Sequence, residues 1–344
     1  MGADFGRGWP WRGPASLTRG LNVQTDQLKD VMVAAVTRAG YLCEGVRKTL
    51  LPESARTKDD RSPVTVADLG AQAVVRRALS ESFADVPVLG EEDASMLEDS
   101  AFAKIVGEAV TLGGVSMDLG ALRRALAPDE GAATAPRRFV LDPIDGTKGY
   151  LRGDQYAVAL ALLEGDQVVA GVLGCPALGP GDAGIVAWAS RGGGTWQAPL
   201  LTDDRSWGQV AVTGTTDASA LRLVESVESG HSSHDHAAQV KQALGIVADP
   251  VRIDSQCKYA VVARGDAEVY LRLPTRPGYR EKVWDHAAGY ICVAEAGGRI
   301  TDARGAPLDF SQGAHLDNNR GVIATHGPLH DRVLEAVAAA LSSD

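Results

Sequence analysis

Apolar residues recur at two spacings along the chain, and these spacings predict both helices and strands. Apolar positions from Leu28 to Leu42 lie three, four and seven residues apart, which places them on one face of a helix. We expect this helix to begin near Asp26, because aspartate is favoured at the N-cap. A polar break at residues 57–63 precedes a second predicted helix at about residues 67–82.

The middle of the chain has short apolar runs of the kind that form antiparallel strands. Residues 156–163 and 168–173 are joined by a polar turn containing glycine, which predicts a β-hairpin. Residues 185–189 and the region of Trp196 flank the glycine triplet 192–194 in the same way. No helix pattern follows that triplet, so we interpret it as a turn and not as a phosphate-binding loop.

The remaining segments alternate between the two patterns. A short strand is expected at residues 87–89, followed by interrupted helix over 93–136 with an exposed loop at 127–136. Further strands are expected near 210–213, 221–227, 251–253 and 268–273, and helices near 237–244, 285–296 and 329–341. Mixed elements with hairpins favour stacked α and β layers over a doubly wound Rossmann sheet.

Length and composition divide the chain and limit what it binds. At 344 residues the chain is long enough for two domains, which we place at 25–198 (α+β) and 199–344 (α/β), after a disordered leader at 1–24. A net charge of −10 argues against binding to nucleic acid polymers. The longest strongly apolar stretch, 156–163, is too short to span a bilayer, so we expect a soluble protein without membrane association.

The cysteines and the N-terminal residues bear on the compartment. The four cysteines are far apart and form no C-x-x-C pair, which favours reduced thiols (Cys43, Cys175, Cys257 and Cys292). Residues 1–20 lack the apolar centre of a secretory signal. We therefore expect a cytoplasmic protein, or an organellar one if residues 1–20 are a targeting remnant.

The most informative segment follows the short apolar strand at 139–141. Asp142 and Asp145 lie three residues apart around a proline turn, and the Ile144 carbonyl lies between them. Clustered oxygen ligands of this kind suit hard divalent cations. Gly146 and Thr147 then offer backbone N–H groups at a possible helix start, where a phosphate can bind. The segment predicts metal-assisted phosphoryl chemistry.

Three other acidic residues follow apolar elements in the same manner. They are Asp68 at the start of a helix, Glu91 after a buried strand, and Asp285 at another helix start. Each alone is more easily explained as a helix cap or a surface charge. Several separate segments of this type can, however, converge on one site.

These motifs resemble those of the inositol monophosphatase superfamily. The resemblance rests on Gly-Glu-Glu at 90–92, Asp-Pro-Ile-Asp-Gly-Thr at 142–147 and Trp-Asp-His-Ala-Ala-Gly at 284–289, and it extends in order over about residues 26–340. It implies an αβαβα sandwich of the inositol monophosphatase/fructose-1,6-bisphosphatase type. It also implies a magnesium-dependent, lithium-sensitive phosphatase with two or three Mg²⁺ ions per site.

The resemblance also assigns roles. The implied metal ligands are Glu91, Asp142, the Ile144 carbonyl, Asp145 and Asp285. Asp68 and Thr147 would orient the attacking water. A phosphate ester repels hydroxide, so a site of this kind must neutralise charge and deprotonate water together.

Features outside the metal motifs resemble one subfamily, the 3′(2′),5′-bisphosphate nucleotidases. They lie at 58–68, 148–153 and 271–274, and at 230–235 and 254–259. The last two segments imply that His231 contacts the nucleotide and that Ser255, Lys258 and Arg272 hold a second phosphate; Gly146, Thr147 and Asp285 complete the substrate site. On chemistry alone the histidines at 231–236 could instead bind a transition metal or form a solvated polar loop.

The resulting hypothesis is an enzyme that removes the 3′-phosphate of adenosine 3′,5′-bisphosphate to give AMP, with 3′-phosphoadenylyl sulfate as a second substrate and a place in sulfur metabolism. We expect a small-molecule partner only, and a monomer. An inositol mono- or bisphosphate phosphatase would share every metal ligand. A non-catalytic phosphonucleotide sensor is the alternative from another class.

Overall fold

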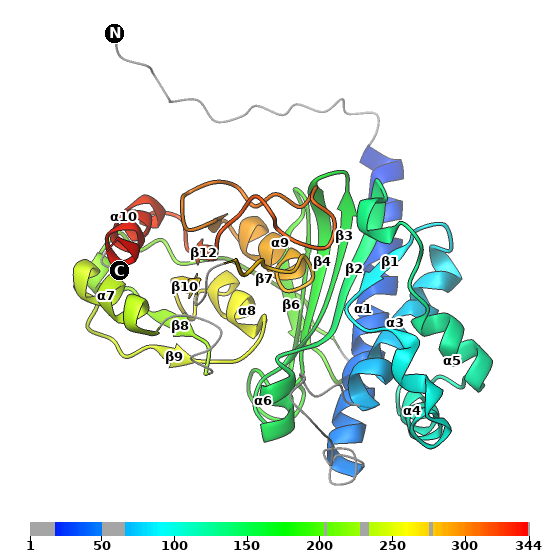
Figure 1. The fold of residues 1–344 in the computed structure, drawn as a ribbon. Helices are drawn as coiled ribbons and strands as arrows, with labels where there is room; N and C mark the ends of the chain where they lie inside the picture. The colour runs from blue at the N-terminus through cyan, green and yellow to red at the C-terminus, as the bar shows by residue number, and fades with distance from the viewer. Residues whose placement is uncertain (1–17, 50–65, 203–204, 228–233, 275–277, 343–344) are drawn as a thin grey trace.

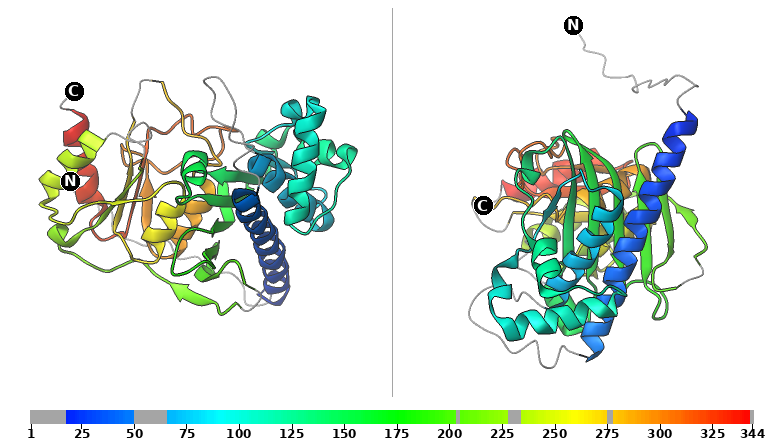
Figure 2. Two further views of the ribbon diagram at one scale, coloured as in Figure 1. Left: turned by 90° about the horizontal axis from the view of Figure 1, so that it is seen from below. Right: turned by 90° about the vertical axis from the view of Figure 1, so that its right-hand side faces the viewer.

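A computed structural model describes residues 18–49, 66–202, 205–227, 234–274 and 278–342. Two sheets alternate with three helical layers, which is the αβαβα arrangement expected from the sequence (Figure 1). Helices α1 and α3 cover one face of the larger sheet, α8 and α9 lie between the sheets, and α7 and α10 cover the far side of the smaller sheet. Figure 2 shows α1 running obliquely across its sheet.

The larger sheet runs in sequence order from β1 to β7 and holds the predicted hairpins. Its strands are β1 (Val88–Gly90), β2 (Arg137–Asp145), β3 (Ala157–Glu164), β4 (Gln167–Cys175), β5 (Ile185–Ser190), β6 (Gly194–Pro199) and β7 (Gly208–Val210). Only the β1–β2 pair is parallel; the other neighbours are antiparallel. That one parallel pair positions the acidic site described below.

The smaller sheet has the order β11–β12–β10–β8–β9, so its strands are not consecutive in the chain. They are β8 (Leu223–Glu225), β9 (Val251–Arg252), β10 (Val269–Arg272), β11 (Arg299–Thr301) and β12 (Val322–Thr325). The sequence analysis located β8, β9 and β10 but not β11 or β12.

The helices account for the remaining layers. They are α1 (Thr18–Thr49), α3 (Val66–Ser82), α4 (Ser100–Leu112), α5 (Leu119–Leu126), α6 (Thr147–Arg152), α7 (His234–Leu244), α8 (Cys257–Ala263), α9 (Ala287–Glu295) and α10 (His330–Leu341), with short 3₁₀ turns at Ala94–Glu98, Ala132–Thr134 and Ala218–Ala220. Within these described ranges, none of the helices is both long and apolar enough to cross a bilayer. All four cysteines are buried and carry no disulfide.

Side-chain alternation along β3 explains how the larger sheet packs on both faces. Val158, Leu160 and Leu162 enter the apolar core beneath α1 and α3. The alternate positions, including Ala157, Ala159 and Ala161, enter the core beneath α8 and α9. A third core lies between the smaller sheet and the pair α7 and α10.

Three expectations about element boundaries were wrong. Helix α1 begins at Thr18, so Asp26 lies inside it and does not form its N-cap. Helix α9 begins at Ala287, so Asp285 lies in the preceding loop and not in the helix. Strand β7 ends at Val210, where we expected a strand to begin. Helix α8 was not foreseen at all.

Candidate active site

The parallel β1–β2 pair brings the first two predicted metal ligands together. Gly90 pairs with Leu141, and the Glu91 N–H donates to the Leu141 carbonyl at 3.2 Å. Glu91, the residue after β1, therefore lies beside Asp142 of the neighbouring strand β2. Asp142 is 2 % exposed, so both the strand pairing and burial fix its position.

A break in strand register carries the chain from Asp142 to Asp145. The pairing with β3 shifts between these residues, and Gly146 follows with φ 89° at the start of α6. The Thr147 hydroxyl donates to the Ile144 carbonyl at 3.2 Å. The structure thus brings together the carbonyl and the hydroxyl that the sequence predicted to share one site.

Helix α3 supports this site from the opposite side. Its first turn carries Asp68, which is buried, and Gln72 follows one turn later. The Gln72 side chain donates to the Glu92 carbonyl at 2.5 Å and accepts from the Glu92 N–H at 3.1 Å. A Cβ on Gly90 would lie 2.4 Å from Gln72 Oε1, so a larger residue at position 90 would displace the Gln72 amide. Gln72 was not predicted from the sequence, where its helical spacing from Asp68 is the one feature that points to it.

Gln256 joins three segments of the site and was also missed. Its backbone N–H donates to Asp145 Oδ2 at 2.5 Å. Its side chain donates to the Trp284 carbonyl at 2.9 Å and accepts from the Gly289 N–H at 3.2 Å. Gln256 therefore links Asp145 to the loop that carries Asp285. In the sequence, the feature that points to Gln256 is its position between the predicted substrate residues Ser255 and Lys258.

The four predicted carboxylate ligands perturb one another strongly. Burial first, and then the charges of Asp285 and Glu92, raise the pKa of Glu91 to about 8. Burial and the charge of Glu91 hold the pKa of Asp142 well above its usual range. Burial also raises the pKa of Asp145 and of Asp285, in the first case together with the charge of Asp285. Mutually repelling carboxylates of this kind form a site that a cation would stabilise.

The donor set fits a hard divalent cation. Asp142 Oδ1 is buried and has no hydrogen-bond partner within the described part of the chain. The surrounding ligand atoms are carboxylate and carbonyl oxygens, which suit Mg²⁺ better than a soft metal. Asp68 interacts electrostatically with Glu92, next to the predicted ligand Glu91. Burial and the Asp68 charge raise the pKa of Glu92 to about 8.

A cationic pair lies beside the carboxylates. Lys258, in α8, is 3 % exposed, and its Nζ donates to the Ile253 carbonyl at 3.2 Å. Burial lowers its pKa to about 8, although the Asp145 charge opposes this shift. Arg272, the last residue of β10, places Nη2 3.3 Å from Asp285 Oδ2. Both predicted cations therefore border the acidic site.

Ser255 lies where the two groups meet. It has φ 67°, a left-handed conformation that is unusual for a residue other than glycine. A Cβ on Gly146 would come within 2.8 Å of the Ser255 Cβ, so these backbones approach closely. His231, the predicted nucleotide contact, lies outside the described residues.

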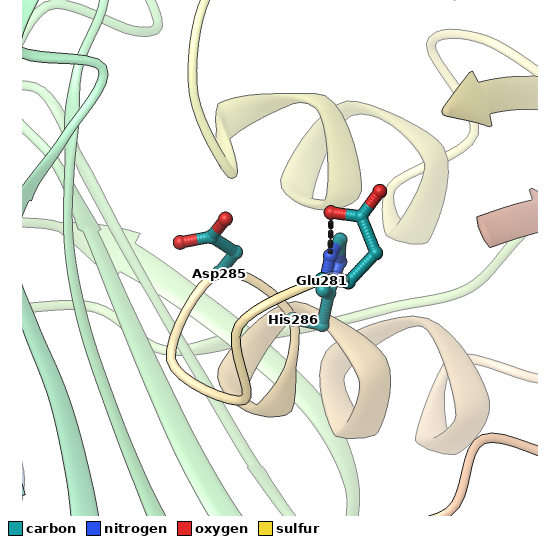
Figure 3. Close-up of side chains that lie close together, drawn as sticks. All are labelled: Glu281, Asp285 and His286. Atoms are coloured by element: carbon teal, nitrogen blue, oxygen red, sulfur yellow. Dashed lines mark hydrogen bonds and ion pairs between the residues drawn. The ribbon is translucent and has the colours of Figure 1, made fainter. Parts of the chain in front are cut away.

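A compact group of possible ligands surrounds Asp285. Ligand atoms of Glu281, Asp285 and His286 lie within 4.8 Å of one another. Glu281 Oε2 is already engaged, because it lies 3.0 Å from His286 Nε2 and 2.7 Å from Arg272 Nε. Figure 3 shows the Asp285 carboxylate directed away from the Glu281–His286 bond. Of the three, Asp285 is the one suited to join the other carboxylates.

The chain is similar to known proteins over most of its length. Residues 24–342 match the model of the inositol monophosphatase family. The chain is 40% identical over 343 residues to a 3′(2′),5′-bisphosphate nucleotidase of Schizosaccharomyces pombe, covering 93% of this chain and 97% of that protein. It is 41% identical over 334 residues to a protein of the same name from Oryza sativa, covering 89% and 92%.

Solved structures resemble the fold. The extragenic suppressor protein suhB of Bartonella henselae has a TM-score of 0.64 at 21% identity and covers 90% of this chain and 98% of its own. CysQ of Bacteroides thetaiotaomicron has a TM-score of 0.62 at 23% identity, with 89% and 98% covered. These likenesses confirm the layered fold, and the sequence match confirms the resemblance found in the motifs. The chain therefore belongs to the inositol monophosphatase family, whose members are metal-dependent.

Proposed function

We propose that this protein is a phosphatase that hydrolyses the 3′-phosphate of adenosine 3′,5′-bisphosphate to AMP and phosphate, and that it also acts on 3′-phosphoadenylyl sulfate. The observation that carries the proposal is the placement of two cations, the buried Lys258 and the partly buried Arg272, at the border of a cluster of buried carboxylates. A substrate with two phosphates can use both. The names of the relatives at about 40% identity support the same substrate class.

In this proposal Mg²⁺ is held by Glu91, Asp142, the Ile144 carbonyl, Asp145 and Asp285, with two or three ions in the site. Bound Mg²⁺ would supply charge neutralisation for the phosphate and a lower pKa for water. Residues 25–198 would supply most ligands, and residues 199–344 would supply Asp285 and the groups that recognise the nucleotide.

The chain's own groups would then orient the reactants. Thr147, held by its bond to the Ile144 carbonyl, would direct the attacking water, and Asp68 would accept its proton. Lys258 and Arg272 would bind the phosphate that is not hydrolysed, because charged donors make strong hydrogen bonds to phosphate oxygens. The Ser255 hydroxyl, which accepts from the Cys257 N–H at 3.2 Å, would add a donor.

The test is phosphate release from adenosine 3′,5′-bisphosphate, 3′-phosphoadenylyl sulfate and inositol 1-phosphate, measured with Mg²⁺, with EDTA and with added Li⁺. We expect rapid release from the two nucleotides that EDTA abolishes and Li⁺ inhibits. Preference for the inositol ester would keep the metal site and reject the nucleotide assignment. No release from any of them would indicate a phosphonucleotide sensor.

A further inference from the structure

We infer that Glu281 is a positioning residue that holds Arg272 for the second phosphate of the substrate and limits its contact with Asp285 to the single bond from Nη2. The inference rests on the proposed function and goes beyond it, because it makes Glu281 a determinant of selectivity for doubly phosphorylated substrates. Figure 3 shows the Glu281 carboxylate beside His286 and apart from the Asp285 carboxylate.

Arg272 lies between two carboxylates that compete for it. Its Nε is 2.7 Å from Glu281 Oε2, whereas its Nη2 is 3.3 Å from Asp285 Oδ2. Nη2 also donates to the Tyr279 hydroxyl at 3.2 Å. The closest contact is the ion pair of Nε with Glu281, and Nε has no hydrogen-bond partner within the described residues. Glu281 therefore acts on the guanidinium through its charge.

Glu281 can do this because a buried chain of contacts fixes it in turn. Its side chain is 4% exposed, and Oε2 accepts from His286 Nε2 at 3.0 Å. His286 is fully buried, and its Nδ1 lies 2.7 Å from the Tyr259 hydroxyl. A carboxylate only accepts, so Nε2 carries the proton, and Nδ1 accepts from the tyrosine in the neutral ring.

Removing the Glu281 charge would release Arg272 towards Asp285. A guanidinium and a carboxylate readily form a two-pronged ion pair, in which two parallel N–H groups are used. Such a pair would withdraw the Arg272 donors from an incoming phosphate and the Asp285 oxygens from a cation. Glu281 therefore keeps both groups available.

The test compares Glu281→Gln with two other variants. Glutamine keeps the size of the side chain and an oxygen acceptor but removes the charge. Tyr259→Phe removes only the far hydroxyl of the chain and should give a smaller effect in the same direction. Glu268→Gln is the matched control, because Glu268 is also a buried glutamate paired with an arginine. Its Oε1 lies 2.6 Å from Arg222. It precedes β10, at the other end of the strand from Arg272.

We expect Glu281→Gln to raise KM for adenosine 3′,5′-bisphosphate about tenfold, the scale of one lost charged hydrogen bond, with a smaller change in kcat. KM for adenosine 3′-phosphate, which lacks the second phosphate, should stay within about twofold. Calorimetry in EDTA should show AMP binding weakened by about tenfold, and calorimetry without nucleotide should show weaker Mg²⁺ binding. Glu268→Gln should change none of these ratios.

Equal increases in KM for both substrates, or unchanged AMP affinity, would reduce Glu281 to a structural residue and overturn the inference. Failure of the proposed function is distinguishable. If the wild type does not hydrolyse the bisphosphate but binds AMP, the binding comparison still decides the role of Glu281. If the wild type binds no AMP, both the inference and the nucleotide assignment fail.

Discussion

At the scale of single residues, the acidic site separates oxygens that the protein engages from oxygens that it leaves for a cation. Asp145 Oδ2 accepts from the Gln256 N–H at 2.5 Å, which fixes the orientation of that carboxylate. Asp142 Oδ1 is buried with no hydrogen-bond partner in the described ranges. A buried, unpaired carboxylate oxygen is costly, and a cation bound there would offset that cost.

Asp145→Asn tests this division. The amide oxygen can still accept from Gln256, but the charge is lost. We expect Mg²⁺-dependent turnover to fall on the order of a thousandfold, because a ligand and part of the site's charge are removed. The unfolding temperature in EDTA should rise slightly, since repulsion from Asp285 is relieved. Asp331→Asn, at a carboxylate 77% exposed in α10, is the control; wild-type turnover in Asp145→Asn would reject the metal assignment.

At the scale of elements, the sequence predicts the helices and strands whose apolar residues recur at a regular spacing or that end in a recognisable turn. The hairpin of β3 and β4 has both, and it lies where expected. Helix α8 was missed because every residue from Cys257 to Ala263 is buried, so no apolar face contrasts with a polar one. Contacts such as those of Gln256 depend on how distant segments meet. The motif around Asp142 predicts which acidic residues share one site. It does not predict the hydrogen bonds of Gln72 and Gln256 that fix the position of Glu92 and Asp145.

The crossing of α8 and α9 gives an element-scale prediction. A Cβ on Gly289 would lie 2.1 Å from the Tyr259 ring, so Gly289→Ala must push the two helices apart. We expect a loss of roughly 1–3 kcal/mol in the free energy of unfolding by urea, together with weaker Mg²⁺ binding, because α9 follows directly after Asp285.

The control for this prediction is Gly107→Ala in α4. A Cβ there meets nothing within 4 Å, so the change should stabilise the protein by about 0.5–1 kcal/mol through helix propensity. If Gly289→Ala behaved like Gly107→Ala, the close approach of α8 and α9 would be of no consequence for stability or for the site.

At the scale of the whole molecule, the acidic site couples stability to pH, because burial and mutual repulsion raise the pKa of its carboxylates. These carboxylates come from the segment after β1, from β2, from α3 and from the loop before α9. In the folded protein without metal, the pKa of Glu91 and that of Glu92 are raised from 4.5 to about 8. Asp142 is shifted in the same direction. Between these values the folded state keeps protons that the unfolded chain has lost, so stability must fall as pH rises through this window.

His330 and Lys258 limit the pH range in which the carboxylates alone determine how stability changes with pH. Burial lowers the pKa of His330 to about 4 from 6.5, which makes stability rise with pH below about 6.5. The pKa of Lys258 is lowered to about 8 from 10.5, which acts in the same sense above pH 8. Between pH 6.5 and pH 8 the carboxylates should therefore dominate.

We expect the unfolding temperature in EDTA to fall by several degrees from pH 6.5 to pH 8, the scale of a change of about 1 kcal/mol or more. Saturating Mg²⁺ should reverse the slope, because a cation binds the deprotonated carboxylates and binding tightens as they lose protons. Glu91→Gln should flatten the profile in EDTA, since it removes one of the raised groups. Scanning calorimetry at the two pH values decides the matter. A melting temperature that does not fall with pH in EDTA would mean that these carboxylates are already ionised without metal, and that the repulsion between them is relieved by the protein itself.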